Sequence, residues 1–125
     1  MKSILMLVCG VLSIGGGALH TSGLRIIDAA LAKANVTGEL AHIVDLAWVF
    51  MGMAMIAFGG ILFTCGLQMR KNNYGGRALA IWVAACLTLF SGGAMIRLGF
   101  DFRFLYFLII GVVSAFACLP DKKTA

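Results

Sequence analysis

Four long apolar stretches, joined by short polar connections, leave this chain few ways to fold. They run over residues 4–19, 43–67, 78–96 and 104–119. A helix needs about 20 mostly apolar residues, within roughly 17–25, to cross the hydrocarbon core of a bilayer. The second and third stretches meet that length clearly, whereas the first and fourth are short. Because the runs are continuous and do not alternate, transmembrane helices fit them better than the strands of a membrane barrel.

The composition excludes the other broad classes of protein. Apolar residues make up 62% of the 125 residues and charged residues only 12%, whereas a soluble domain carries about a quarter charged residues. Disorder requires low hydrophobicity, which this chain does not have. The net charge of +5 indicates contact with anionic lipid headgroups rather than nucleic acid, since no soluble basic module is present. The sequence therefore predicts one all-α integral membrane domain over residues 1–125, with the lipid bilayer as partner and no nucleic acid.

The basic residues predict how the four spans are oriented. Both termini and the connection between the second and third spans fall on one side, with these basic residues: Lys2, Arg70, Lys71, Arg77, Lys122 and Lys123. The other side carries Arg25, Lys33, Arg97 and Arg103. Because short cytoplasmic loops are enriched in Lys and Arg, we expect both termini in the cytoplasm, beneath a bacterial inner membrane.

The first apolar stretch has a second interpretation. Lys2, an apolar run and the small residues 16–18 are also typical of a secretory signal peptide with its cleavage site. Its removal would leave three spans. The connection that follows, from Gly23 to Ala34, predicts an amphipathic helix at the outer surface, because one helical face carries Leu24, Ile27, Leu31 and Ala34.

Small residues recur every seven positions and predict how the spans pack. The repeats are Ser3, Gly10 and Gly17 in the first span, Gly52, Gly59 and Gly66 in the second, and Ala78, Ala85, Gly92 and Gly99 in the third. The fourth span places Gly111, Ser114, Ala115 and Cys118 on one face. Such a repeat keeps one seam facing a neighbouring helix, and small side chains let membrane helices approach closely. We therefore expect a four-transmembrane-helix antiparallel bundle, with large residues such as Phe58 and Trp82 facing lipid or filling gaps.

Ionisable residues collect at the expected outer mouth of this bundle. The candidates for a ligand site or for ion pairs are Glu39, His42, Asp45, Arg97, Asp101 and Arg103. Asp45 shares the seam of Gly52, so it should point inward, where Arg97 should meet it. Three interpretations stay open: structural ion pairs, the polar floor of a binding or translocation site, and a metal site. The metal site would use Glu39 and His42, which are spaced as in half of a di-metal motif; because the second half is missing, no metal and no cofactor are predicted.

Catalytic chemistry has little support in the sequence. No nucleophile stands beside a base and an orienting partner, so we expect no enzyme. Cys9, Cys65 and Cys118 fall near the cytoplasmic ends of three spans. A thiol cluster is one interpretation, but we expect these residues to act as small apolar side chains.

Several short features follow a recognisable order along the chain. Glu39 opens the second span, Gly59-Gly60 lies within it, Arg77 opens the third span and Arg97-Leu98-Gly99 ends it. This order resembles a loose group of small bacterial four-helix membrane proteins whose function is uncharacterised. The resemblance implies a fold and no activity.

The packing faces and the polar residues predict different functions. From the small-residue faces we expect an accessory or scaffold element that binds membrane helices, of a second copy or of a larger membrane complex. The alternative is a small transporter or a lipophilic-ligand-binding protein, in which Asp45 and Arg97 form the polar site at the outer mouth.

Overall fold

The computed structural model describes residues 1–120, and all of its regular structure in that range is helical. Five helices follow one another: α1 (Lys2–Ser22), α2 (Leu24–Lys33), α3 (Glu39–Arg70), α4 (Arg77–Leu98) and α5 (Phe102–Cys118). α1, α3 and α4 are each long and apolar enough to cross a membrane, and α5 is a shorter apolar helix of 17 residues. The predicted all-α class is confirmed, and α1, α3 and α4 extend beyond the predicted limits at both ends.

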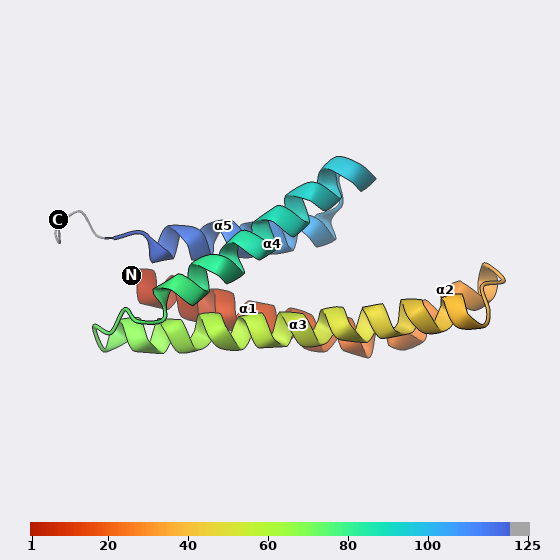
Figure 1. Cartoon of the computed structure of the whole chain (residues 1–125), viewed down its shortest axis with the longest axis horizontal. Helices are drawn as coiled ribbons and strands as arrows, with labels where there is room; N and C mark the ends of the chain where they lie inside the picture. Colours follow the sequence, from red (N-terminus) through yellow and green to blue (C-terminus); the bar gives the residue numbers. More distant parts are fainter. Residues whose placement is uncertain (121–125) are drawn as a thin grey trace.

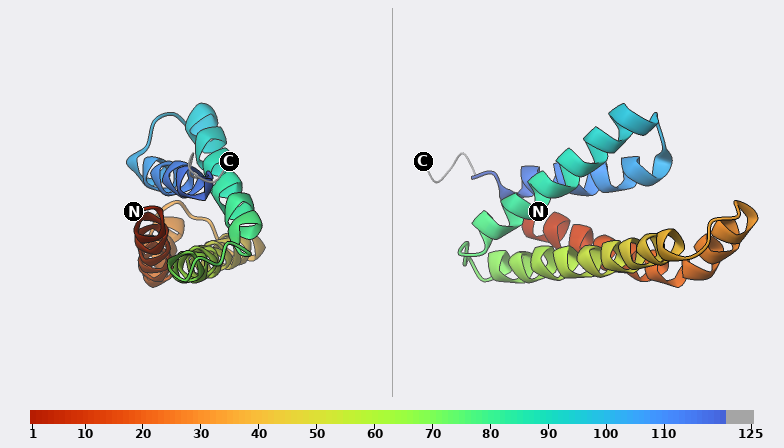
Figure 2. Two further views of the ribbon diagram at one scale, coloured as in Figure 1. Left: turned by 90° about the vertical axis from the view of Figure 1, so that its left-hand side faces the viewer. Right: turned by 45° about the vertical axis from the view of Figure 1, so that its right-hand side comes forward.

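The four apolar helices form two antiparallel pairs, α1 with α3 and α4 with α5 (Figure 1). The pairs meet where α1 begins, α3 passes to α4 and α5 ends, which we call the joined end. From there α4 leads away from α3, so that the α4–α5 connection stands apart from the α2–α3 connection at the opposite, open end (Figure 2). The antiparallel order agrees with the prediction, but the helices do not close into a bundle at the open end.

Glycines bring α1 and α3 into backbone contact along the predicted seam. A Cβ atom added at Gly10 would lie 2.6 Å from the amide nitrogen of Phe63, and one added at Gly17 would lie 2.7 Å from the carbonyl oxygen of Gly52. A Cβ atom at Gly59 would lie 2.7 Å from the carbonyl oxygen of Gly10. Backbone atoms cannot move aside as the end of a side chain can, so these positions require glycine. The seven-residue seam is therefore confirmed for this pair of helices.

Two side-chain hydrogen bonds reinforce the contacts of α1. The buried Ser13 hydroxyl donates to the carbonyl oxygen of Met55 on α3, at 2.9 Å. Tyr106 on α5 donates its hydroxyl to the carbonyl oxygen of Leu12, at 2.6 Å. α1 is thereby bonded both to its partner α3 and to α5 of the other pair, so it connects the two helix pairs.

The seam predicted for the third span is wrong. A Cβ atom added at Gly92 meets nothing within 4 Å, and Ala78 and Gly99 are exposed. The buried residues of α4 are Ala80, Val83, Ala84, Leu87 and Ser91. Ala80, Ala84, Leu87 and Ser91 follow one another at steps of four, three and four residues, which is the spacing of the two inward positions of a heptad, and Val83 flanks this row. Glycine and alanine recur at one heptad position of the neighbouring face, which is not the buried one.

The buried face of α4 packs against a glycine of α5. A Cβ atom added at Gly111 would lie 2.5 Å from the Thr88 hydroxyl oxygen and 3.0 Å from the carbonyl oxygen of Ala84. Gly111, Ser114 and Cys118 are buried as predicted, whereas Ala115 is exposed. This close contact explains why α4 follows α5 and leaves α3.

The large side chains divide between lipid-facing and packed positions. Trp82 is 71% exposed and Phe50 is 74% exposed, as expected of residues that face acyl chains. Phe58 is instead partly buried against the core. The predicted amphipathic helix is present as α2. On its predicted face Leu24, Ile27 and Leu31 are half-buried, whereas Ala34 is the C-cap and is exposed.

Candidate functional site

The polar residues predicted to form an outer mouth lie in two separate places at the open end. Glu39, His42 and Asp45 stand on the first turns of α3. Arg97, Asp101 and Arg103 lie around the α4–α5 connection, which the divergence of α4 carries away from α3 (Figures 1 and 2). Glu39 and His42 are exposed. The structure therefore does not assemble these six residues into one polar site.

The expected ion pair between Asp45 and Arg97 is not formed. Within residues 1–120, the salt bridge that the structure contains joins Arg103 to Asp101. Arg97 is exposed. Asp45 is half-buried, and its Oδ1 atom is buried without a hydrogen-bond partner among the described residues. The pair fails because α4 packs its buried face on α5, so Arg97 is never brought to the face of α3 that carries Asp45.

Asp101 is the N-cap of α5 and forms an ion pair with Arg103. Its Oδ1 atom accepts a hydrogen bond from the backbone N–H of Arg103 at 2.8 Å, which caps the helix. The Arg103 Nε atom lies 3.0 Å from each carboxylate oxygen. Hydrogen bonds from the Arg103 side chain and backbone lower the pKa of Asp101 from 3.8 to about 2. Since the pair is exposed, its role is to fix the start of α5, and exposed pairs contribute little free energy.

Substitutions at Asp45 and Arg97 are expected to act independently. Because no contact joins the two side chains, the free-energy changes for Asp45→Asn and Arg97→Gln should add in the double variant, within about 0.5 kcal/mol. Chemical unfolding of the four proteins in detergent measures this. A coupling clearly above about 0.5 kcal/mol would show that the two residues meet in the membrane.

Three cysteines lie close to the joined end, inside the apolar core. Cys9, Cys65 and Cys118 are all buried and belong to the main cluster of packed apolar side chains. The described residues contain no group of three His, Cys, Asp or Glu side chains arranged to hold a metal ion. Burial among packed apolar side chains is what a role as small apolar residues requires of these cysteines.

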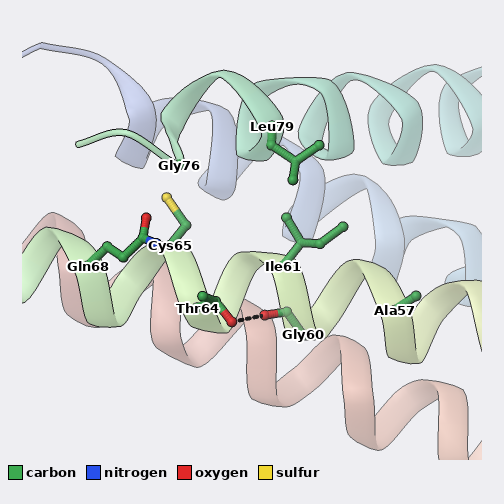
Figure 3. A pocket seen from close by; sticks show the side chains of 8 residues that line it. All are labelled: Ala57, Gly60, Ile61, Thr64, Cys65, Gln68, Gly76 and Leu79. Carbon is green, nitrogen blue, oxygen red and sulfur yellow. Dashed lines mark hydrogen bonds between the residues drawn. The ribbon is translucent and has the colours of Figure 1, made fainter. Parts of the chain in front are cut away.

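An open groove of about 320 Å³ lies between α3 and α4 (Figure 3). Ile61 of α3 and Leu79 of α4 point into it from opposite sides. Small or short residues of α3 line the rest of its length, among them Ala57, Gly60 and Thr64. No local pattern in the sequence indicates this groove, because it forms only where α4 begins to leave α3.

The polar groups of the groove differ in their hydrogen bonding. Thr64 donates its hydroxyl to the carbonyl oxygen of Gly60, at 2.8 Å, so this group is already satisfied (Figure 3). Gln68 lies where the groove reaches the joined end, and its Oε1 atom is buried without a partner in the described part of the chain. Gly76 passes so close that an added Cβ atom would lie 2.6 Å from this oxygen. The groove thus has its unsatisfied polar oxygen at this end, while the hydroxyl of Thr64 farther along is already hydrogen-bonded.

Comparisons of the chain with protein-family models, with curated proteins and with solved structures found no match. A function for this chain is therefore inferred from its own geometry.

Proposed function

We propose that this protein is a membrane scaffold that works through helix–helix packing, and that its docking surface is the groove side of α3. The occupant of this surface is α3 of a second copy. In such a two-fold dimer the same face of each copy meets the other, with Gly60 near the crossing point. Association into a larger membrane complex would use the remaining lipid-facing surface.

The observation that carries this proposal is the open face at Gly60. A Cβ atom added there meets nothing within 4 Å, although Gly59, the next residue, is in backbone contact with α1. α3 therefore has two small-residue faces, and only one of them is covered inside the monomer. In lipid, helices associate through close van der Waals contact rather than the hydrophobic effect, and small residues four apart, as Gly60 and Thr64 are, permit it.

The hydrogen bonding of this face also favours a helix as occupant. Because the Thr64 hydroxyl already donates to Gly60, a docked helix would not strand an unpaired donor in lipid, which would be costly. The alternative function, a transporter or ligand-binding protein at the outer mouth, has weaker support, since Asp45 and Arg97 stand apart.

The spans and their orientation belong to the same proposal. α5 runs antiparallel to α4 and is mostly apolar after Arg103, which supports a fourth crossing despite its length. Four basic residues gather at the joined end: Lys2, Arg70, Lys71 and Arg77. Their position supports placing both termini on the cytoplasmic side of a bacterial inner membrane.

Reporter domains fused after Ala125 and inserted within residues 72–76 should both report the cytoplasm. An external signal from either reporter would refute this orientation.

Replacing Gly60 by leucine should abolish self-association without unfolding the monomer. Energy transfer between donor-labelled and acceptor-labelled copies in lipid bilayers measures the association. We expect the dissociation constant to rise at least about tenfold, because a bulky side chain at the crossing point separates the backbones.

Gly15→Leu is the matched control for this experiment. Gly15 lies on α1, and a Cβ atom added there also meets nothing within 4 Å, but Gly15 does not line the groove. This variant should associate as the wild-type protein does. Absence of energy transfer in the wild-type protein, or equal loss in both variants, would refute self-association through α3.

A further inference from the structure

A second hollow, of about 220 Å³, opens at the joined end, where the helices of both pairs meet. Its polar lining comes from Lys2, Ser3, Tyr74 and Arg77, and apolar side chains including Met69 and Phe116 complete the wall. Within the described part of the chain, no Asp or Glu side chain lines this hollow. The hollow therefore presents cationic and hydroxyl groups beside an apolar wall.

Arg77 is the central residue of this hollow. Its guanidinium lies over the ring of Tyr74, 4.0 Å from the ring centre, in a cation–π contact that holds it in place. The Nε atom of Arg77 is buried and has no hydrogen-bond partner among residues 1–120. No carboxylate of the described residues lies within salt-bridge distance of it. Because a buried charged donor without a partner is costly, Arg77 fits a ligand that supplies anionic oxygen atoms.

The helix that begins at Arg77 adds to the positive potential. Gly76 is the N-cap of α4, so no side chain caps the first turn, and that turn contains no acidic residue. The N-terminus of a helix carries a partial positive charge and free N–H groups. Both effects favour an anion beside Arg77.

Lys2 contributes to the shape of the hollow. Its ammonium group donates to the carbonyl oxygen of Leu119 at 2.6 Å, just beyond α5. This contact ties the start of α1 to the end of α5 and holds a second cation at the rim.

We propose that this hollow binds the phosphate group of an anionic phospholipid, with Arg77 as its main ligand and the acyl chains beside Phe116. The hollow lies at one end of the apolar helices, at the depth where headgroups meet the hydrocarbon. Basic pockets between transmembrane helices bind anionic headgroups in this way. A free phosphate ion shares the same chemistry and is the other source that the test must distinguish. The hollow does not include Gly60, so the proposal of lipid binding does not depend on the proposal of self-association.

The test uses the full chain in detergent, with thermal unfolding followed during titration with three probes. They are short-chain phosphatidylglycerol, phosphatidylcholine with the same chains, and inorganic phosphate. We expect phosphatidylglycerol alone to raise the melting temperature of the wild-type protein in a saturable manner. Arg77→Gln should weaken this binding at least about tenfold, because it removes the charge-assisted hydrogen bonds.

Arg70→Gln is the matched control, since Arg70 is exposed at the same end of the molecule and the substitution removes the same charge. It should change the affinity much less than Arg77→Gln does. Arg77→Lys keeps the charge but loses Nε–H and the planar fork, so it should bind phosphatidylglycerol with intermediate affinity.

Three results would overturn the proposal. Equal stabilisation of the wild-type protein by the two lipids would show that the headgroup charge is not recognised. Equal stabilisation by inorganic phosphate would assign the hollow to a free anion. Equal losses in Arg70→Gln and Arg77→Gln would show a diffuse surface attraction. If Arg77→Gln does not fold, two measurements still test the proposal. They are the affinity of Arg77→Lys for phosphatidylglycerol and the preference of the wild-type protein for phosphatidylglycerol over phosphatidylcholine and inorganic phosphate.

Discussion

Leucine at position 59 is expected to destabilise the protein strongly, whereas leucine at position 60 should leave its stability nearly unchanged. At Gly59 an added Cβ atom would lie 2.7 Å from backbone atoms of α1, the carbonyl oxygen of Gly10 and the nitrogen of Ile14. Overpacking usually costs about 1–3 kcal/mol, and we expect the upper part of that range because the obstructing atoms belong to a helix backbone. Chemical unfolding of both variants in detergent measures the difference.

These two adjacent glycines control for each other. Both variants gain the same side chain in the same turn of α3, so helix propensity and hydrophobicity change equally. Similar unfolding midpoints for the two variants would show that α1 and α3 do not pack through Gly59. The comparison also establishes whether Gly60→Leu is folded, which the self-association experiment requires.

Leucine at position 111 is expected to separate α5 from α4, whereas leucine at position 92 should be tolerated. The Cβ atom at Gly111 would lie 2.9 Å from the backbone nitrogen of Thr88 and 3.0 Å from the carbonyl oxygen of Ala84. At Gly92 nothing lies within 4 Å. We expect a loss of about 1–3 kcal/mol for Gly111→Leu and a small change for Gly92→Leu.

This second comparison distinguishes the seven-residue repeat from the packing seen in the structure. The repeat places Gly92 in the seam of α4, and the structure places it on an uncovered face. Chemical unfolding in detergent, read together with the rate of amide hydrogen exchange in α5, provides the measurement. A larger loss for Gly92→Leu than for Gly111→Leu would favour the seam that the sequence predicted.

The α1–α3 contact was predictable because glycine itself is the signal there. Where two helix backbones touch, only glycine fits, so Gly10, Gly17, Gly52 and Gly59 mark the contact in the sequence directly. On α4 the partner glycine, Gly111, lies on the other helix. The buried face of α4 therefore contains ordinary residues such as Leu87 and Ser91, which a count of glycines overlooks.

The polar residues are harder to place from the sequence, for a different reason. Pairing Asp45 with Arg97 relies on their similar depth in adjacent spans. Similar depth brings two side chains together only if the spans stay in contact along their whole length. The choice of α5 as the neighbour of α4 depends on packing that no local pattern records. The hollow at Arg77 has a local signal, an arginine that opens a helix with no acidic residue nearby, but its other wall comes from Lys2 and Phe116, at distant positions in the chain.

The length of α3 constrains how the protein sits in a bilayer. Its 32 residues span about 48 Å at 1.5 Å per residue, against a hydrocarbon thickness of about 30 Å. Transmembrane helices rarely tilt by more than about 40°, which would still leave α3 longer than the hydrocarbon is thick. Its first turns, with Glu39 and His42, must therefore stand among the headgroups or in water, together with α2. The apolar part of α3, residues 43–67, spans about 38 Å at 1.5 Å per residue. We therefore expect α3 to tilt in a bilayer of ordinary thickness, and a thicker bilayer to reduce that tilt.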